Sequence, residues 1–208
     1  MVNKETHMEI TIDEKVWIPT PYGMAEVISF KGMDKEHVIF AFGNWREEKA
    51  PQVRIHSECL TGDVFGSKRC DCGPQLEEAM KRFSESSGIL IYLRQEGRGI
   101  GLLNKLRAYK LQDQGYDTYE ANRQLGFPED IREFKVAADM LKALQVDRVQ
   151  LLSNNPAKVK GLKDNGIQVV HRLFTRTYRC SHNKNYLDAK IRFGHDGLQS
   201  QFLKEVKL

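Results

Sequence analysis

Three of the four cysteines in the chain lie close together, in the stretch CLTGDVFGSKRCDCG at residues 59–73. Cys70 and Cys72 flank Asp71, and Cys59 lies eleven positions before Cys70. Two thiolates one residue apart can bind the same ion where the backbone turns, and three ligands leave one position of a tetrahedral zinc site open. An open position lets a metal hold a water molecule and lower its pKa toward about 7. The spacing therefore favours a catalytic metal centre over a structural zinc ribbon, which needs two CxxC pairs.

The competing interpretation of these cysteines is structural. A single free cysteine is usually a small core residue, but three in one polar, glycine-containing segment favour a metal site. Cys180, in the segment YRCSHN, could be a fourth ligand together with His182. A lone cysteine in a polar tail is more often incidental, so ligation by Cys180 is the weaker hypothesis.

Arginines and glycines lie on both sides of the cysteine cluster. RIHSE at residues 54–58 precedes Cys59, and RQEGRGIG at residues 94–101 follows the cluster. Glycines let backbone N–H groups approach phosphate oxygens, and Arg94 and Arg98 can offer bidentate contacts. Ordinary strand-to-helix turns use the same residues, and the sequence has no GxxxxGK[ST] loop. Beside a metal site, however, the pattern indicates a phosphate-bearing ligand.

Two other groups of polar residues admit two interpretations each. His56 could be a metal ligand or a general base, but a histidine on a strand is more often a hydrogen-bonded structural residue. Asp130 and Arg132 lie two apart in PEDIREF. From the residues alone, we favour an acidic helix N-cap with a solvated arginine at that point.

The composition is that of an ordinary globular protein. The 208 residues are 40% hydrophobic and 29% charged, and the chain is long enough to form a core without metal or disulfide crosslinks. A net charge of +4 fits an anionic small molecule better than DNA, which usually demands a stronger basic stripe. The N-terminus lacks a signal-peptide apolar region, and no stretch approaches the ~20 apolar residues of a membrane span. We therefore expect a cytoplasmic protein with no nucleic-acid or membrane partner.

The elements that must position these residues alternate along the chain. Apolar patterning predicts strands at 24–32, 37–45, 51–60, 88–95, 148–156 and 167–173, and helices at 74–88, 99–115, 131–146 and 157–166. The wholly apolar centre of 88–95 indicates a strand buried on both faces. The order predicts an α/β fold with α+β character: a mixed sheet with flanking helices and an N-terminal β-rich lobe. We expect one domain over 1–208, with the β-rich lobe at 1–50, a catalytic core at 51–172 and a peripheral, solvated arm at 173–208.

Several long segments of the sequence resemble the GTP cyclohydrolase II family. They are RIHSECLTGD, RCDCGPQLE, RQEGRGIGLLNKLRAYKLQDQGYDT, ANRQLGF, LLSNNPAKV and YLDAK. The resemblance is strong over about residues 50–171 and loose before them. No dihydroxybutanone-phosphate synthase domain precedes the matching part, so the resemblance implies the monofunctional form. It implies that GTP and water give 2,5-diamino-6-ribosylamino-4(3H)-pyrimidinone 5′-phosphate, formate and pyrophosphate, the first step of riboflavin biosynthesis.

The resemblance also implies cofactors and site residues. It implies one zinc ion per subunit on Cys59, Cys70 and Cys72, Mg²⁺ with the triphosphate, and a homodimer. The implied GTP contacts are Arg54, Ile55, His56, Ser57, Glu58, Gln75, Glu96, Gly97, Arg98, Thr118, Ser153 and Lys158. Among these, we expect the Glu96 carboxylate to distinguish guanine from adenine.

The resemblance further implies Asp130 as proton acceptor, Arg132 as nucleophile and Tyr109 as an assisting group at the ring. A guanidinium is almost never deprotonated in proteins. An alternative role for Arg132 is therefore to stabilise charge on the transferring phosphoryl group while water attacks.

The sequence departs from the family near its end. It has YRCSHNKNYLDAK where a stretch like GRNPNNEHYLDTK is usual, and Ser153 stands where threonine is common. Two other functions remain open: a homologue that stops at a formylated pyrimidine, and a non-catalytic, zinc-stabilised module that binds a nucleotide or RNA.

Overall fold

A computed structural model of the protein describes residues 9–192, and its centre is a mixed sheet. Its strands are β1 (Thr11–Thr20), β2 (Gly23–Lys31), β3 (Val38–Phe42), β4 (Gln52–Ser57), β5 (Gly88–Leu93), β6 (Arg148–Leu152) and β7 (Gln168–Leu173). The order across the sheet is β1-β2-β3-β5-β4-β6-β7. The pairings from β1 to β5 are antiparallel, and those from β5 to β7 are parallel. The predicted α/β class with a mixed sheet is confirmed.

The helices alternate with the parallel strands. They are α1 (Leu60–Asp63), α2 (Cys72–Ser86), α3 (Leu102–Gln112), α4 (Thr118–Gln124), α5 (Lys135–Ala143), α6 (Pro156–Asp164) and α7 (Lys184–Arg192), with short 3-10 turns at Trp45–Glu47 and Glu96–Gly99. Every strand and helix expected from the sequence occurs, with ends shifted by a few residues. Strand β1 and helices α1, α4 and α7 were missed. For α4 a signal was present, because Asp117 and Glu120 form a capping box at its start.

The β-rich N-terminal segment is the antiparallel half of this same sheet. Strand β3 joins it to the parallel half by pairing with β5, with Ile39 opposite Ile91. The sheet therefore continues without a break from the N-terminal strands to β7.

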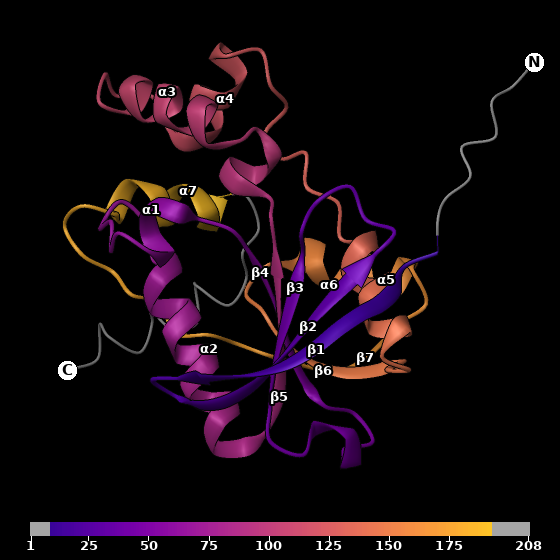
Figure 1. Ribbon diagram of the computed structural model, residues 1–208. Coiled ribbons are helices and arrows are strands. Elements are labelled where there is room, and N and C mark those ends of the chain that lie inside the picture. Colours follow the sequence, from indigo (N-terminus) through magenta and orange to yellow (C-terminus); the bar gives the residue numbers. More distant parts are fainter. Residues whose placement is uncertain (1–8, 193–208) are drawn as a thin grey trace, which may run out of the picture.

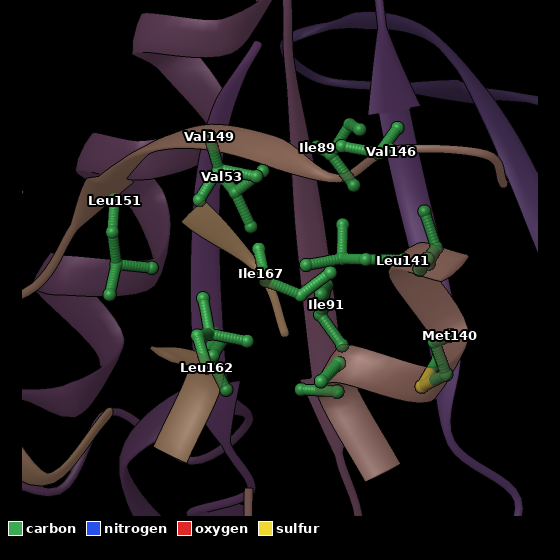
Figure 2. Packing of buried hydrophobic residues seen from close by; sticks show 14 of the residues in the cluster. Val53, Ile89, Ile91, Met140, Leu141, Val146, Val149, Leu151, Leu162 and Ile167 are labelled. Atoms are coloured by element: carbon green, nitrogen blue, oxygen red, sulfur yellow. The ribbon is translucent and has the colours of Figure 1, made fainter. Parts of the chain in front are cut away.

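Apolar side chains cover both faces of the sheet. On one face Ile89 and Ile91 of β5 pack with Met140 and Leu141 of α5, as Figure 2 shows. On the other face Leu90 packs with residues of α2. Alternation along a strand sends successive side chains to opposite faces, so β5 is buried on both, as its apolar sequence predicted.

The parallel strands β4, β5 and β6 all end at the same edge of the sheet. Figure 1 shows α3 and α4 beyond this edge, with α1 and α7 beside them. In open α/β sheets the carboxyl ends of parallel strands are the usual place for a ligand. The residues that follow these strands are therefore the first place to look for a site.

Helix α7 corrects one expectation from the sequence. Residues 173–208 were expected to form a solvated arm, but Leu187 and Ala189 of α7 are fully buried and Asn183 is nearly so. The many charged residues of this segment concealed a short apolar face that docks on the rest of the chain. Residues 193–208 of the predicted arm lie outside the described range. Within residues 9–192, no helix is long and apolar enough to cross a membrane.

Candidate active site

The three clustered cysteines meet just beyond the carboxyl end of β4. The Sγ atoms of Cys59, Cys70 and Cys72 lie within 4.8 Å of one another, and those of Cys59 and Cys70 are 3.6 Å apart. With Zn–S bonds of about 2.3 Å, a tetrahedral site needs sulfur atoms about 3.8 Å apart. The donors therefore fit zinc in both type and spacing. Among the described residues, no other His, Cys, Asp or Glu joins this group.

Two glycines make this approach of the cysteines possible. A Cβ at Gly62 would lie 2.8 Å from Cys70 Sγ and 3.1 Å from Cys59 Sγ. A Cβ at Gly73 would lie 2.4 Å from the Gly62 carbonyl oxygen. Any side chain at either position would separate α1 from the start of α2, so the glycines of LTGD and CDCG are needed to bring the two ligand segments together.

A buried ammonium group faces the sulfur cluster. Lys105 Nζ donates hydrogen bonds to Cys59 Sγ at 3.1 Å and to Glu96 Oε1 at 2.8 Å. Hydrogen bonds from the Cys70 and Cys72 thiols, together with Lys105, hold the pKa of Cys59 well below its usual value. Burial lowers the pKa of Lys105, but the Cys59 thiolate and Glu96 outweigh it and raise the pKa overall. The site is thus built to stabilise thiolate at Cys59.

The Glu96 carboxylate is largely occupied by the protein itself. Besides Lys105, it accepts hydrogen bonds from the backbone N–H groups of Leu60 at 2.7 Å and Gly97 at 2.8 Å. A carboxylate offers about four acceptor sites, so little capacity remains for a ligand. Glu96 lines the pocket, and these contacts give it a role in fixing the start of α1 beside Cys59.

His56 of β4 is held by a buried carboxylate. Its Nε2 lies 3.1 Å from Asp63 Oδ1, and Asp63 also accepts from the Cys59 N–H at 2.9 Å and the Tyr92 hydroxyl at 2.8 Å. Burial lowers the pKa of His56, despite the opposing effect of Asp63. These contacts agree with the structural interpretation of His56, although its ring also lines the pocket.

Cationic side chains converge on the same pocket. Arg54 is buried and donates to Gln75 Oε1 at 2.9 Å, while buried Lys158 donates to the Ile55 carbonyl at 2.7 Å. Burial lowers the pKa of Lys158 well below its usual value, and neighbouring Arg132 adds to this effect. A bound anion would relieve both the burial cost and the repulsion.

The glycine-rich loop directs one of its two arginines into the pocket. Gly97 and Arg98 both adopt left-handed backbone conformations, with φ of 62° and 61°. The Arg98 guanidinium lies 4.0 Å from the centre of the Tyr119 ring, and within residues 9–192 its buried Nη1 has no hydrogen-bond partner. Arg94 was expected to bind phosphate as well, but it is half-exposed and pairs with Glu58 instead.

Asp130 and Arg132 form an ion pair at the rim of the pocket. Arg132 Nε lies 2.9 Å from Asp130 Oδ1, and Arg132 Nη1 lies 3.4 Å from Ser57 Oγ. Burial lowers the pKa of Arg132, but Asp130 outweighs it and raises the pKa overall. Helix α5 begins only at Lys135, so the N-cap interpretation of Asp130 was wrong.

Tyr109 of α3 approaches the sulfur cluster through Thr61. Its hydroxyl lies 3.3 Å from Thr61 Oγ1, which lies 3.8 Å from Cys59 Sγ. Burial raises the pKa of Tyr109, so the phenol stays protonated near neutral pH and can donate a hydrogen bond into the pocket.

The structure gathers most of the residues expected from the sequence around one pocket. Its lining includes the three cysteines with Arg54, His56, Ser57, Glu58, Gln75, Glu96, Gly97, Arg98, Tyr109, Thr118, Arg132, Ser153 and Lys158. Ile55 is an exception, because its side chain is fully buried in the core on the opposite face of β4. Asp130 is outside the lining and contacts Arg132. Cys180 is separate from the sulfur cluster, and its Sγ donates to the Lys68 carbonyl.

Sequence reasoning missed several residues of the pocket. Lys105, Asn154, Asn155, Tyr186 and Lys190 all line it. Each of these residues lies in a segment that resembles the family, and this resemblance could have identified them. Their residue types alone did not indicate a role in the pocket.

Fold and site together define a class of protein. A mixed α/β sheet carries three clustered thiols that could hold a metal ion, beside a cationic pocket at the carboxyl ends of its parallel strands, an arrangement that suits a metal-assisted enzyme acting on an anionic substrate. Comparison with known proteins narrows this class. The family model described as GTP cyclohydrolase II matches residues 11–174.

Relatives that match most of this chain agree with the family model. The chain is 50% identical over 198 residues to a GTP cyclohydrolase-2 of Aliivibrio fischeri, covering 94% of this chain and 97% of that protein. It is 53% identical over 178 residues to a GTP cyclohydrolase-2 of Vibrio cholerae, covering 84% and 90%. It is also 48% identical over 195 residues to the riboflavin biosynthesis protein RibBA of Staphylococcus aureus, covering 92% of this chain and 49% of that protein. The chain belongs to the GTP cyclohydrolase II family, a family of enzymes.

Proposed function

We propose that this enzyme hydrolyses GTP to 2,5-diamino-6-ribosylamino-4(3H)-pyrimidinone 5′-phosphate, formate and pyrophosphate, the first step of riboflavin biosynthesis. The observation that carries the proposal is that one pocket is lined both by the three thiols and by Arg54, Arg98 and Lys158. The reaction needs both, because it removes C8 of a purine ring and cleaves a triphosphate. The family of the chain and the names of its relatives support the same substrate.

Zinc is the metal that the thiol cluster fits best, and Cys59, Cys70 and Cys72 would hold it. The soft thiolate donors and their spacing support zinc over Mg²⁺, which prefers oxygen ligands. When bound, zinc supplies Lewis acidity that activates water next to the guanine ring. Mg²⁺ would instead arrive with the triphosphate, since it is usually bound through substrate phosphates.

Tyr109 would assist the chemistry at C8. Water must add at C8 twice overall, once to open the imidazole ring and once to release formate. The protonated Tyr109 hydroxyl, which is linked through Thr61 to Cys59, can orient a water molecule or pass a proton to a ring nitrogen. Buried Lys105 holds Cys59 and Glu96 in place during these steps.

The cationic residues would bind the triphosphate. Arg54, Arg98 and Lys158 are buried or half-buried, so their charges act in a medium of low dielectric constant and attract an anion strongly. The other residues proposed to contact GTP are His56, Ser57, Glu58, Gln75, Glu96, Gly97, Thr118 and Ser153. Ile55 would act only through its backbone, because its carbonyl holds Lys158.

Arg132 is best suited to an electrostatic role in the release of pyrophosphate. Pairing with Asp130 raises its pKa, which disfavours the neutral guanidine that a nucleophile requires. A charged Arg132 would stabilise the negative charge on the transferring phosphoryl group while water attacks the α-phosphorus. Asp130 would orient Arg132 and accept the proton of that water. A phosphoramidate trapped on Arg132 during turnover would instead support the nucleophilic role.

The substrate test compares GTP with ATP. Purified protein loaded with zinc is incubated with each nucleotide and Mg²⁺, and nucleotide consumption is followed by chromatography. We expect GTP to be consumed and ATP to persist, and equal consumption or no consumption of GTP would contradict the proposal. The implied homodimer stays a prediction, which light scattering during size-exclusion chromatography would test.

A further inference from the structure

The segment YLDAK resembles a family motif, yet the proposed chemistry gives none of its residues a role. It lies in α7, which brings Tyr186 and Lys190 into the lining of the pocket. The Tyr186 hydroxyl lies 4.0 Å from Cys72 Sγ, and the Lys190 ammonium lies 4.4 Å from the centre of the Tyr186 ring. The helix therefore contacts the active site through two side chains of one motif.

Lys190 forms an ion pair with a carboxylate inside the ligand segment. Lys190 Nζ lies 2.8 Å from Asp71 Oδ1, and the two side chains are 13% and 0% exposed. Asp71 lies between Cys70 and Cys72. A buried carboxylate without a cation is costly, so Lys190 supplies the countercharge for Asp71 at this position.

Asp71 is linked to Arg54 by hydrogen bonds through Gln75. The second oxygen of Asp71 accepts from Gln75 Nε2 at 2.6 Å, and Gln75 Oε1 accepts from Arg54 Nη2 at 2.9 Å. The donor and acceptor types fix the direction of the chain, because a carboxylate can only accept and a guanidinium can only donate. The Gln75 amide therefore has one favourable orientation, with its nitrogen toward Asp71 and its oxygen toward Arg54.

This arrangement leaves the charge of Arg54 available to a ligand. Lys190 neutralises Asp71, and Gln75 keeps the Arg54 guanidinium from pairing directly with that carboxylate. The buried Nε of Arg54 has no hydrogen-bond partner in the described part of the chain. Without Lys190, Asp71 would attract Arg54, and the loss of Arg54 from the pocket would weaken the binding of an anion.

We propose that Lys190 is a positioning residue that acts on the triphosphate through Asp71, Gln75 and Arg54. Helix α7 therefore contributes to substrate binding. The inference deepens the proposed function and rests on it.

The test compares Lys190→Met with a matched control on the same helix. The dissociation constant of a non-hydrolysable GTP analogue is measured on zinc-loaded protein, along with KM and kcat for GTP. We expect Lys190→Met to weaken analogue binding and raise KM about tenfold, with a smaller change in kcat. Lys190→Arg should restore most of the affinity. Lys184→Met, which removes an exposed charge from α7, should bind as the wild type does.

A double variant separates positioning from direct contact with the ligand. Asp71→Asn removes the charge that Lys190 neutralises, so the Asp71→Asn/Lys190→Met double variant should bind the analogue more tightly than Lys190→Met, whereas the loss of a direct contact would not be recovered. It also removes the buried charge that would hinder folding of the single variant. Losses that add in full, or a folded Lys190→Met variant with wild-type affinity, would overturn the proposal.

A second measurement keeps the inference separate from the proposed function. A wild type that neither binds the analogue nor consumes GTP would refute the proposed function. Zinc affinity, from competition with a chromophoric chelator, does not depend on GTP. We expect the zinc affinity to fall about tenfold in Lys190→Met, because Asp71 lies between the ligands Cys70 and Cys72. If the wild type does not act on GTP, unchanged zinc affinity in Lys190→Met would refute the role of Lys190 as well.

Discussion

The ammonium group of Lys105 donates a hydrogen bond to the sulfur of Cys59 at 3.1 Å. Three thiolates around one divalent cation leave a net negative charge, and a buried ammonium beside them offsets it. Residues just outside a metal's ligands typically change metal affinity or activity by 10–100-fold when they are replaced. Lys105 is therefore as much a part of the candidate metal centre as the cysteines.

Replacing Lys105 with methionine should weaken zinc binding by about tenfold or more, because the Cys59 thiolate loses its charge partner. Zinc affinity is measured by competition with a chromophoric chelator. Lys110→Met, which alters an exposed lysine of the same helix, is the control and should have no effect. Wild-type affinity in Lys105→Met would show that the contact does not matter.

Removing the metal should abolish turnover but leave most of the fold. The two apolar clusters that cover the faces of the sheet do not include the cysteines, so the core does not depend on them. Far-UV circular dichroism during heating, with and without a chelator, is the measurement. We expect a cooperative transition in both, and loss of secondary structure on chelation at 25 °C would favour a zinc-stabilised binding module instead.

Arg132→Ala should lower the rate of pyrophosphate release about 10²–10³-fold, because one preorganised charge is lost at the transferring phosphoryl group. Pyrophosphate and formate are measured in the same samples. Arg132→Lys should recover part of the rate if the role is electrostatic. A variant in which pyrophosphate release keeps its wild-type rate would exclude Arg132 from that step.

Tyr109→Phe should slow formate release about 10²-fold or more, because the hydroxyl that assists at C8 is removed. A formylated pyrimidine should then accumulate, which mass spectrometry detects. Tyr116→Phe, at a nearby exposed tyrosine, serves as the control. If wild-type protein itself consumed GTP without releasing formate, the chain would be a homologue that stops at the formylated product.

Acid should destabilise the protein below about pH 6.5 through His37, whose Nδ1 accepts the Arg94 N–H at 2.9 Å. Burial lowers the pKa of His37, with Lys35 and Arg94 adding to this effect and Asp34 opposing it. Below about pH 6.5, the ordinary pKa of histidine, the unfolded chain therefore binds more protons at His37 than the folded chain does. The free energy of unfolding then decreases as the pH is lowered.

Urea unfolding at pH 7.5 and 5.5 measures this loss. His37→Asn keeps an acceptor for the Arg94 N–H but does not titrate, so its loss between the two pH values should be smaller. It should not vanish, because burial also lowers the pKa of His56. An equal loss in both proteins would rule out His37 as the cause.

Local patterns in the sequence predicted most of the fold. The apolar run of β5 and the helical spacing of α2 are visible within a few residues, because burial on one or both faces leaves a periodic trace. Helix α7 left a weaker trace, since its buried face is only Leu187 and Ala189 among charged residues. Its position depends on contacts with parts of the chain more than one hundred residues away, such as Lys190 with Asp71.

The candidate site likewise has residues that local sequence predicted and residues whose contacts depend on distant segments. The cysteines were predictable because their residue type and spacing are specific to metal binding. The Ile55 side chain does not reach the pocket, since alternation along β4 sends Arg54 and His56 to the pocket and Ile55 to the core. The contact of Ile55 with GTP stays a prediction. The contacts of Lys105 with Cys59 and of Glu96 with the Leu60 N–H could not be predicted, because they arise from a pairing of distant segments.

The central claim is tested most directly by measuring formate, pyrophosphate and the pyrimidine product together in one reaction with GTP, Mg²⁺ and zinc-loaded protein. We predict that the three appear in equal amounts and match the GTP consumed. All three should disappear when Cys59, Cys70 and Cys72 are replaced by serine. Pyrophosphate without formate, or turnover that persists in the serine variant, would contradict the account.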